Sequence, residues 1–127
     1  MNYLTTVQVL CFYARLIAKT GCPSGLRDLS PLETAVTCPQ VTFDGNDLHS
    51  GLRARAATII VSLVRNRPFV GCNNRVGVTV AGIFLRRNAV RLTATNDEVE
   101  EHALALAQAL LKTAPITVWF ARHTVRV

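Results

Sequence analysis

Two long apolar segments separated by a short polar loop constrain the fold of this chain more than any other feature. Residues 52–65 (LRARAATIIVSLVR) are apolar on almost every side beyond Ala54, and residues 74–87 (NRVGVTVAGIFLRR) have the same character. Their content of Val, Ile and Thr is compatible with strands, but their lengths favour helices. A helix without a polar face lies in the middle of a bundle. The sequence therefore predicts two central helices joined by a loop.

Two further helices are predicted before this pair. Residues 5–19 carry apolar side chains at helical spacing, with Thr5 or Thr6 as the cap. The run Ser30-Pro31-Leu32-Glu33 contains a capping serine, a proline suited to the first helical position and a capping-box glutamate. We expect the second helix to be short, because Pro39 stops it.

Two helices are also predicted after the central pair, and residues 41–51 are predicted to form a loop. Thr95-Asn96-Asp97-Glu98 is a capping box that opens a helix over residues 96–111, and the last helix covers residues 113–123. No repeat or linker divides the chain. The predicted fold class is all-α: a single domain of residues 1–127, built as a compact six-helix bundle around the two central apolar helices.

The composition favours a folded, basic domain. Half of the residues are hydrophobic, which supports a packed core and argues against disorder. Fourteen Lys and Arg against eight Asp and Glu give a formal charge of +6, and most of the basic residues are arginine. Arginine suits phosphates and carboxylates, so the partner could be a nucleotide, a nucleic acid or an acidic protein. The base composition of the genome would equally account for the arginines.

The cysteines and the apolar runs indicate a cytoplasmic protein without a membrane span. Cys11, Cys22, Cys38 and Cys72 form no CxxC pair, so we expect reduced, mostly buried thiols and neither a metal site nor a disulfide framework. The N-terminal residues lack the pattern of a signal peptide. The longest apolar run, Val76–Leu85, is far shorter than the ~20 residues that span a bilayer.

The loop between the central helices has the composition of an anion site. A helix that begins at Asn73 or Asn74 presents unpaired N–H groups and a partial positive charge. Gly71 allows a tight turn, and Arg75 can form paired hydrogen bonds to a phosphate. The alternative is an ordinary helix–helix connection in which an asparagine serves only as the cap.

The loop also carries a family resemblance. The stretch 67–75, RPFVGCNNR, resembles the signature of the Fic/Doc family, whose Doc branch reads His-Pro-Phe-x-Asp-Gly-Asn-Lys-Arg. Further stretches are similar to the Doc pattern in order and spacing: residues 25–28, 32–35, 39–40, 84–88 and 91–95. The resemblance covers roughly residues 3–123. It implies an all-helical fold and the toxin half of a type II toxin–antitoxin system.

The resemblance implies a chemistry that this loop does not retain in full. Fic proteins transfer AMP to a hydroxyl, whereas Doc toxins phosphorylate elongation factor Tu and so inhibit translation. In both, a loop histidine is the general base, a loop acid holds Mg²⁺ on the phosphates of ATP, and the asparagine and basic residues bind those phosphates. The family histidine falls on Arg67, the acid on Gly71, the glycine on Cys72 and the lysine on Asn74, whereas Pro68, Phe69, Asn73 and Arg75 match.

Two of these replacements remove catalytic groups. Arg67 stays protonated at neutral pH and cannot accept a proton. Gly71 has no side chain with which to bind Mg²⁺, so the expected ligand of the ion is missing. We therefore expect Asn73, Asn74 and Arg75 to bind ATP weakly, and the motif to be degenerate. Asp44, Asp47 or His49 in the preceding loop could substitute for the missing groups, with a solvent-facing loop as the alternative.

The remaining histidines and aromatic residues have simpler interpretations. Phe43-Asp44-Gly45-Asn46 looks like part of a Fic motif but lacks its basic residues and the following apolar helix. His102 is predicted to lie at the surface and His123 to be solvated. Trp119 and Phe120 are predicted to be core residues.

Three functional hypotheses follow. The first is a Doc-like toxin with an altered or inactive site, which binds an acidic antitoxin through a Phd-like helix laid in a groove. The alternative is a non-catalytic pseudoenzyme that only binds or sequesters antitoxin. An RNA-binding protein or ribonuclease, suggested by Arg86, Arg87 and Arg91, is the least supported, because no aromatic platform or acidic cluster accompanies the charge.

Overall fold

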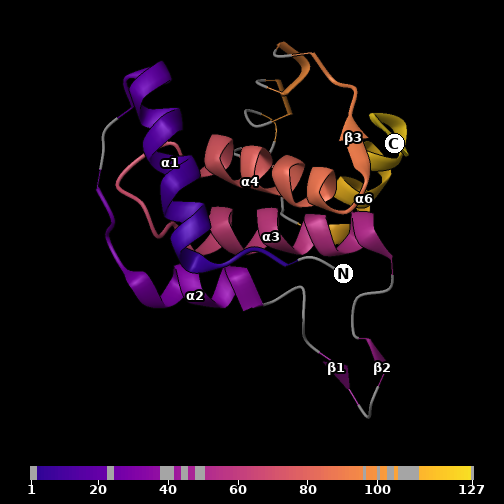
Figure 1. The fold of residues 1–127 in the computed structure, drawn as a ribbon, viewed down its shortest axis with the longest axis horizontal. Helices are drawn as coiled ribbons and strands as arrows, with labels where there is room; N and C mark the ends of the chain where they lie inside the picture. The colour runs from indigo at the N-terminus through magenta and orange to yellow at the C-terminus, as the bar shows by residue number, and fades with distance from the viewer. Residues whose placement is uncertain are drawn as a thin grey trace.

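Helices make up most of the chain. Figure 1 shows the computed structural model, which describes residues 3–22, 25–37, 42–43, 46–47, 51–95, 97–99, 101–102, 105 and 112–126. Its elements are α1 (Thr6–Thr20), α2 (Leu29–Thr37), β1 (Thr42–Phe43), β2 (Asn46–Asp47), α3 (Leu52–Asn66), α4 (Asn73–Arg87), β3 (Val90–Leu92), α6 (Thr113–Arg122) and β4 (Thr124–Arg126). The described residues between 97 and 105 are also helical. The all-α prediction is confirmed, with two small sheets added to the helices.

The two apolar segments form the centre of the fold, as predicted. α3 and α4 lie side by side, α3 also contacts α2 and α6, and α1 lies against α4 (Figure 1). The helices approach closely at Gly77, where a Cβ atom would lie 3.5 Å from the Cα of Ile60. The helical assignment wins over the strand alternative because both segments are long enough to bury apolar side chains against several neighbours at once. The core contains Leu32, Ile60, Leu63, Phe69, Phe84, Leu85 and Phe120, all fully buried.

Of the three predicted helix caps, two are right and one is wrong. Thr5 caps α1 with a reciprocal capping box to Gln8, and Thr95 makes the same exchange with Glu98. The predicted capping role of Ser30 is wrong. α2 begins at Leu29, two residues before the predicted first position at Pro31, and the Asp28 carboxylate accepts a hydrogen bond from the Ser30 N–H at 3.2 Å. Asp28 is therefore the residue that satisfies this helix end.

The prediction of a plain loop over residues 41–51 is also wrong. β1 and β2 pair antiparallel there, with Thr42 opposite Asp47, and the hairpin extends away from the helices (Figure 1). A second antiparallel pair joins β3 to β4, with Arg91 opposite Val125. Such short strands carry too few residues to show a period-two pattern in the sequence.

The cysteine prediction is wrong for the described residues. Cys22 and Cys72 form a disulfide, and the free thiol of Cys11 is exposed rather than buried. Cys38 lies outside the described residues. A cross-link between positions 50 residues apart stabilises a fold by about 4 kcal/mol in the chain-entropy model.

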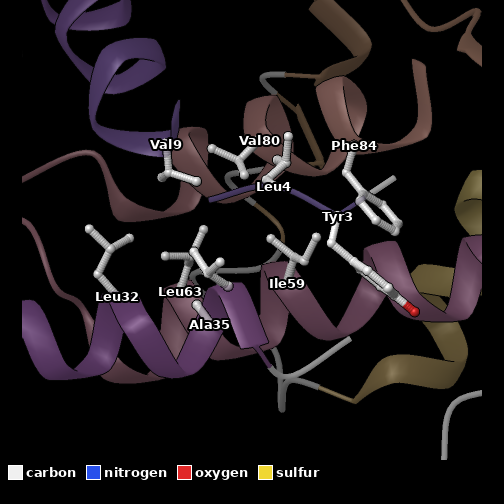
Figure 2. A pocket seen from close by; sticks show the side chains of 10 residues that line it. Tyr3, Leu4, Val9, Leu32, Ala35, Ile59, Leu63, Val80 and Phe84 are labelled. Atoms are coloured by element: carbon white, nitrogen blue, oxygen red, sulfur yellow. The ribbon is translucent and has the colours of Figure 1, made fainter. Parts of the chain in front are cut away.

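The N-terminal segment closes an apolar pocket instead of leaving a ligand cavity. Tyr3 and Leu4 lie over side chains from α1, α2, α3 and α4, among them Val9, Leu32 and Phe84 (Figure 2). The remaining space is about 10 Å³, room for one water molecule at most. This pocket is part of the core. Among the described residues, no helix is both long and apolar enough to cross a membrane.

Candidate functional site

The loop between α3 and α4 begins and ends on residues with left-handed backbone conformations. Arg67 has φ +46° and closes α3 through its N–H, which donates to the Leu63 carbonyl at 3.1 Å. Cys72 has φ +58° and precedes the first residue of α4. Non-glycine residues adopt this conformation at a cost of order 1–3 kcal/mol, and only where their surroundings hold it. The loop is therefore strongly constrained by its neighbours.

The middle of the loop is fixed by the segment that follows α1. The Pro68 carbonyl accepts hydrogen bonds from the N–H groups of Arg27 at 2.6 Å and Asp28 at 3.2 Å. The Val70 N–H donates to the Gly25 carbonyl at 2.9 Å. This exchange resembles the edge pairing of two strands, and it satisfies backbone groups that the core would otherwise bury unpaired.

Tyr13 of α1 completes this anchorage. Its ring stacks on Phe69 with centroids 3.9 Å apart, and its hydroxyl accepts a hydrogen bond from the Gly25 N–H at 2.9 Å. A Cβ atom at Gly25 would lie 2.9 Å from Val70, and Gly25 has φ +141°, so glycine is required here. The sequence interpretation assigned no role to Tyr13. Its position on the buried face of α1 was the only available signal.

Asn73 fastens the loop to the start of α4. Its side chain is buried, with 2% exposed, and its Oδ1 accepts a hydrogen bond from the Phe69 N–H at 3.0 Å. Its Nδ2 donates to the Phe69 carbonyl, also at 3.0 Å. The observed role of Asn73 is thus to satisfy the loop backbone. Its predicted contact with a phosphate stays a prediction.

The N-terminus of α4 gives the loop its electrostatic character. No side chain caps this helix end, and its first turn contains no acidic residue. The first N–H groups of α4, from Asn73 to Arg75, carry the positive end of its dipole. Arg67 is exposed and Arg75 is half-buried nearby in the sequence. This arrangement favours an anion over any other small ligand.

The donor set of the loop does not suit Mg²⁺. Residues 66–75 contain no carboxylate, and the ion prefers oxygen ligands of that kind. Asp44 and His49 lie outside the described residues, and only the backbone of Asp47 is described, in β2.

The two histidines predicted to be solvated are instead packed on Trp119. The His102 and His123 rings both stack on Trp119, with centroids 4.1 and 4.3 Å from it. The His123 Nε2 lies 3.2 Å from a carboxylate oxygen of Glu98, and its Nδ1 lies 2.8 Å from the Trp119 carbonyl oxygen. Burial, followed by the charge of His123, lowers the pKa of His102.

The aromatic residues of α6 are closer to their prediction. Phe120 is fully buried, and the partly buried Trp119 packs against the core. His102 was predicted to lie at the surface because Glu100 and Glu101 precede it, and His123 was predicted to be solvated because it is near the end of the chain. The His102 ring reaches Trp119 through the packing of two elements that are separated in the sequence, and local sequence patterns do not predict such packing.

Comparison with known proteins gives one informative match. No model of a known protein family matches the chain. A stretch of 72 residues, 57% of the chain, is 39% identical to the curated protein Toxin Doc of Mycolicibacterium smegmatis. The match covers 55% of that protein, so the chain spans about half the length of the curated relative that it matches. The similarity supports a Doc-like family for this chain and does not test the altered loop motif.

Replacing Asn73 should uncouple the loop from α4. Asn73→Ala leaves the buried N–H and carbonyl of Phe69 without their partner, so we expect the free energy of unfolding in urea to fall by about 2–4 kcal/mol. Asn66→Ala is the matched control. The exposed side chain of Asn66 makes only a 3.4 Å hydrogen bond to Ser62, and its loss should change stability by about 0.5 kcal/mol or less. Equal effects of the two substitutions would contradict the fastening role.

Acidification should destabilise the histidine–tryptophan cluster. The pKa of His102 is lower in the folded state than its ordinary value of 6.5, so the unfolded state binds the proton more readily. Its contribution to stability is present above pH 6.5 and is lost as the pH falls through the folded-state pKa. Urea unfolding followed by Trp119 fluorescence measures this loss.

His102→Gln is the control for this experiment, because glutamine does not titrate and should abolish the loss in that pH range. Glu98 also has a lowered pKa, chiefly through its hydrogen bond from the Thr95 backbone. Its protonation acts only below its ordinary value of 4.5, so the two groups are separable. An unchanged pH profile in the variant would refute the assignment to His102.

Proposed function

We propose that this chain is a Doc-like toxin of a type II toxin–antitoxin pair, whose loop binds the phosphates of a nucleotide but lacks the usual catalytic groups. The observation that carries the proposal is the rigidly held N-terminus of α4. This helix end is basic and has no side-chain cap, and the loop that precedes it contains no carboxylate. The similarity to a protein named Toxin Doc supports the family part of the proposal.

Some residues of the loop position the N-terminus of α4, and others bind the phosphates of ATP. Pro68, Phe69 and Asn73 are buried and set the direction of α4. Asn74, Arg75 and the first N–H groups of α4 bind the phosphates of ATP, and Arg67 adds charge at the rim. Arg67 cannot act as a general base at neutral pH. Losing such a base slows transfer by about 10²–10⁴-fold, so phosphorylation of elongation factor Tu is weak or lost.

The proposed antitoxin lies in the groove between α1 and α4. Phe12 and Leu16 of α1 and Ile83 of α4 line this groove, and Arg15 and Lys19 stand beside them. α1 and α4 contain no acidic residue, and the Arg87 guanidinium lies 5.9 Å from the centre of the Phe12 ring. An amphipathic acidic helix would match both the apolar lining and the charge. The proposed site of action is the cytoplasm, where a translation factor is present.

A pseudoenzyme that only sequesters antitoxin is the second candidate. It is favoured by the same absence of a base and of a metal-binding carboxylate in residues 66–75. The two candidates share the groove and the anion site, and they differ in whether any transfer occurs.

Calorimetric titration with ATP tests the anion site. We expect weak binding that changes little when Mg²⁺ is added, because the loop supplies no carboxylate for the ion. Arg75→Ala should weaken binding by roughly tenfold, as expected for a lost charge-assisted hydrogen bond. Arg86→Ala, at the opposite end of α4, should leave it unchanged. Binding that depends strictly on Mg²⁺ would show that a carboxylate from elsewhere completes the site.

Restoring the family histidine and acid in the loop tests whether their loss explains the proposed absence of phosphoryl transfer. Arg67→His combined with Gly71→Asp reinstates a base and a metal-binding carboxylate, so we expect transfer of labelled phosphoryl from ATP to elongation factor Tu to rise by about 10²-fold or more. Expression of this variant in a bacterium should then arrest growth.

Each single substitution is the matched control for the pair, because neither alone restores both groups. A parent chain that labels the factor as fast as the double variant would refute the loss of catalytic groups. A double variant without activity, tested after circular dichroism shows that it is folded, would refute the kinase-like assignment.

A further inference from the structure

The Cys22–Cys72 disulfide joins the end of α1 directly to the candidate anion-binding loop. Cys22 follows Gly21, which terminates α1, and Cys72 is the residue on which α4 begins. Their Cα atoms are 6.3 Å apart, and both residues are half-buried. Because neither cysteine is fully buried, we expect a dissolved thiol to reach the bond without unfolding of the core.

The bond constrains only one part of the loop. Pro68, Phe69 and Val70 are held by backbone hydrogen bonds to residues 25–28 and by the Tyr13 ring, none of which involves a cysteine. The cross-link instead fixes Cys72, whose left-handed conformation a non-glycine residue keeps only under constraint. Asn73 is held separately by its two hydrogen bonds to Phe69. Opening the bond therefore leaves both flanks in place and releases Gly71 and Cys72, the two residues that lead into α4.

We propose that Cys22 and Cys72 form a redox-responsive site that controls the order of the anion-binding loop. The co-reactant is a dithiol. One of its thiolates attacks a sulfur of the disulfide, the S–S bond breaks, and a mixed disulfide forms. The second thiol then displaces the protein cysteine. In total, two electrons and two protons pass from the dithiol to Cys22 and Cys72, and the dithiol becomes a disulfide.

The position of the two sulfurs favours attack at Cys22. A thiolate that leaves from Cys72 stands at the positive end of α4, where negative charge is stabilised. A better-stabilised leaving group departs faster.

The inference rests on the proposed function for its effect on ligand binding and for the reducing compartment in which the proposed toxin acts. Disulfides in reducing compartments are commonly transient and redox-sensing. Oxidation closes the bond and orders Gly71 and Cys72 immediately before the α4 N-terminus, and reduction loosens these two residues. The oxidised chain therefore binds nucleotide phosphate more tightly than the reduced chain.

The test uses the full chain with Cys11→Ser and Cys38→Ser, so that only the bonded pair can react. Native protein is treated with dithiothreitol without denaturant and alkylated, and its mass is then measured by mass spectrometry. We expect two added alkyl groups after reduction and none before it. Hydrogen exchange at residues 71–75 should become faster by roughly fivefold or more on reduction, whereas exchange in α3 should change little. ATP binding should weaken by about threefold to tenfold.

Two results would overturn the inference. One is a bond that opens only in denaturant, which is the behaviour of a purely structural cross-link. The other is reduction that leaves exchange at residues 71–75 unchanged. Faster exchange without ATP binding in either state supports the redox site and contradicts the proposed anion site. The Cys22→Ser/Cys72→Ser variant should show the hydrogen exchange and the ATP affinity of the reduced chain, and dithiothreitol should change neither.

Discussion

The candidate site depends on the anchorage of one buried residue, Phe69. Its ring stacks on Tyr13, its N–H and carbonyl are both bonded to Asn73, and the neighbouring peptide groups pair with residues 25–28. α1, the segment after it and α4 therefore meet at one peptide. Because the two hydrogen bonds between Phe69 and Asn73 are buried, water cannot replace them cheaply. The direction in which the N–H groups of α4 point is set by this anchorage and not by the loop sequence alone.

This anchorage explains why the α4 N-terminus can act as a fixed positive group. A helix dipole favours an anion only within the first turn, so a loop that moved by a few ångströms would lose the effect. The long apolar contact between α3 and α4 holds the helix axis, and Asn73 holds its first residue. Packing thus fixes the partial positive charge, which every helix N-terminus carries, at one position in the molecule. The basic groove on α1 and α4 extends the same sign of charge along the bundle.

Local patterns in the sequence were sufficient for the helices and insufficient for their connections. The capping boxes at Thr5 and Thr95 and the two apolar segments act within a few residues, so they could be predicted. The disulfide joins positions 50 residues apart, and it forms because residues 25–28 pair with residues 68–70. No spacing rule reveals that pairing. His102 illustrates the same limit, because nothing in the sequence around it indicates that its ring stacks on Trp119.

The burial of the loop residues separates what the fold requires from what chemistry requires. Pro68, Phe69 and Asn73, which match the Doc pattern, are buried, whereas Arg67, Gly71 and Asn74, which depart from it, are exposed or half-buried. A buried residue cannot change without loss of stability, but a surface residue can. A chain can thus lose a base and a metal ligand while its loop keeps the same shape. Apart from the half-buried Arg75, the matching part of the motif is therefore an argument for the fold, and the positions of the missing base and metal ligand lie in the part that differs.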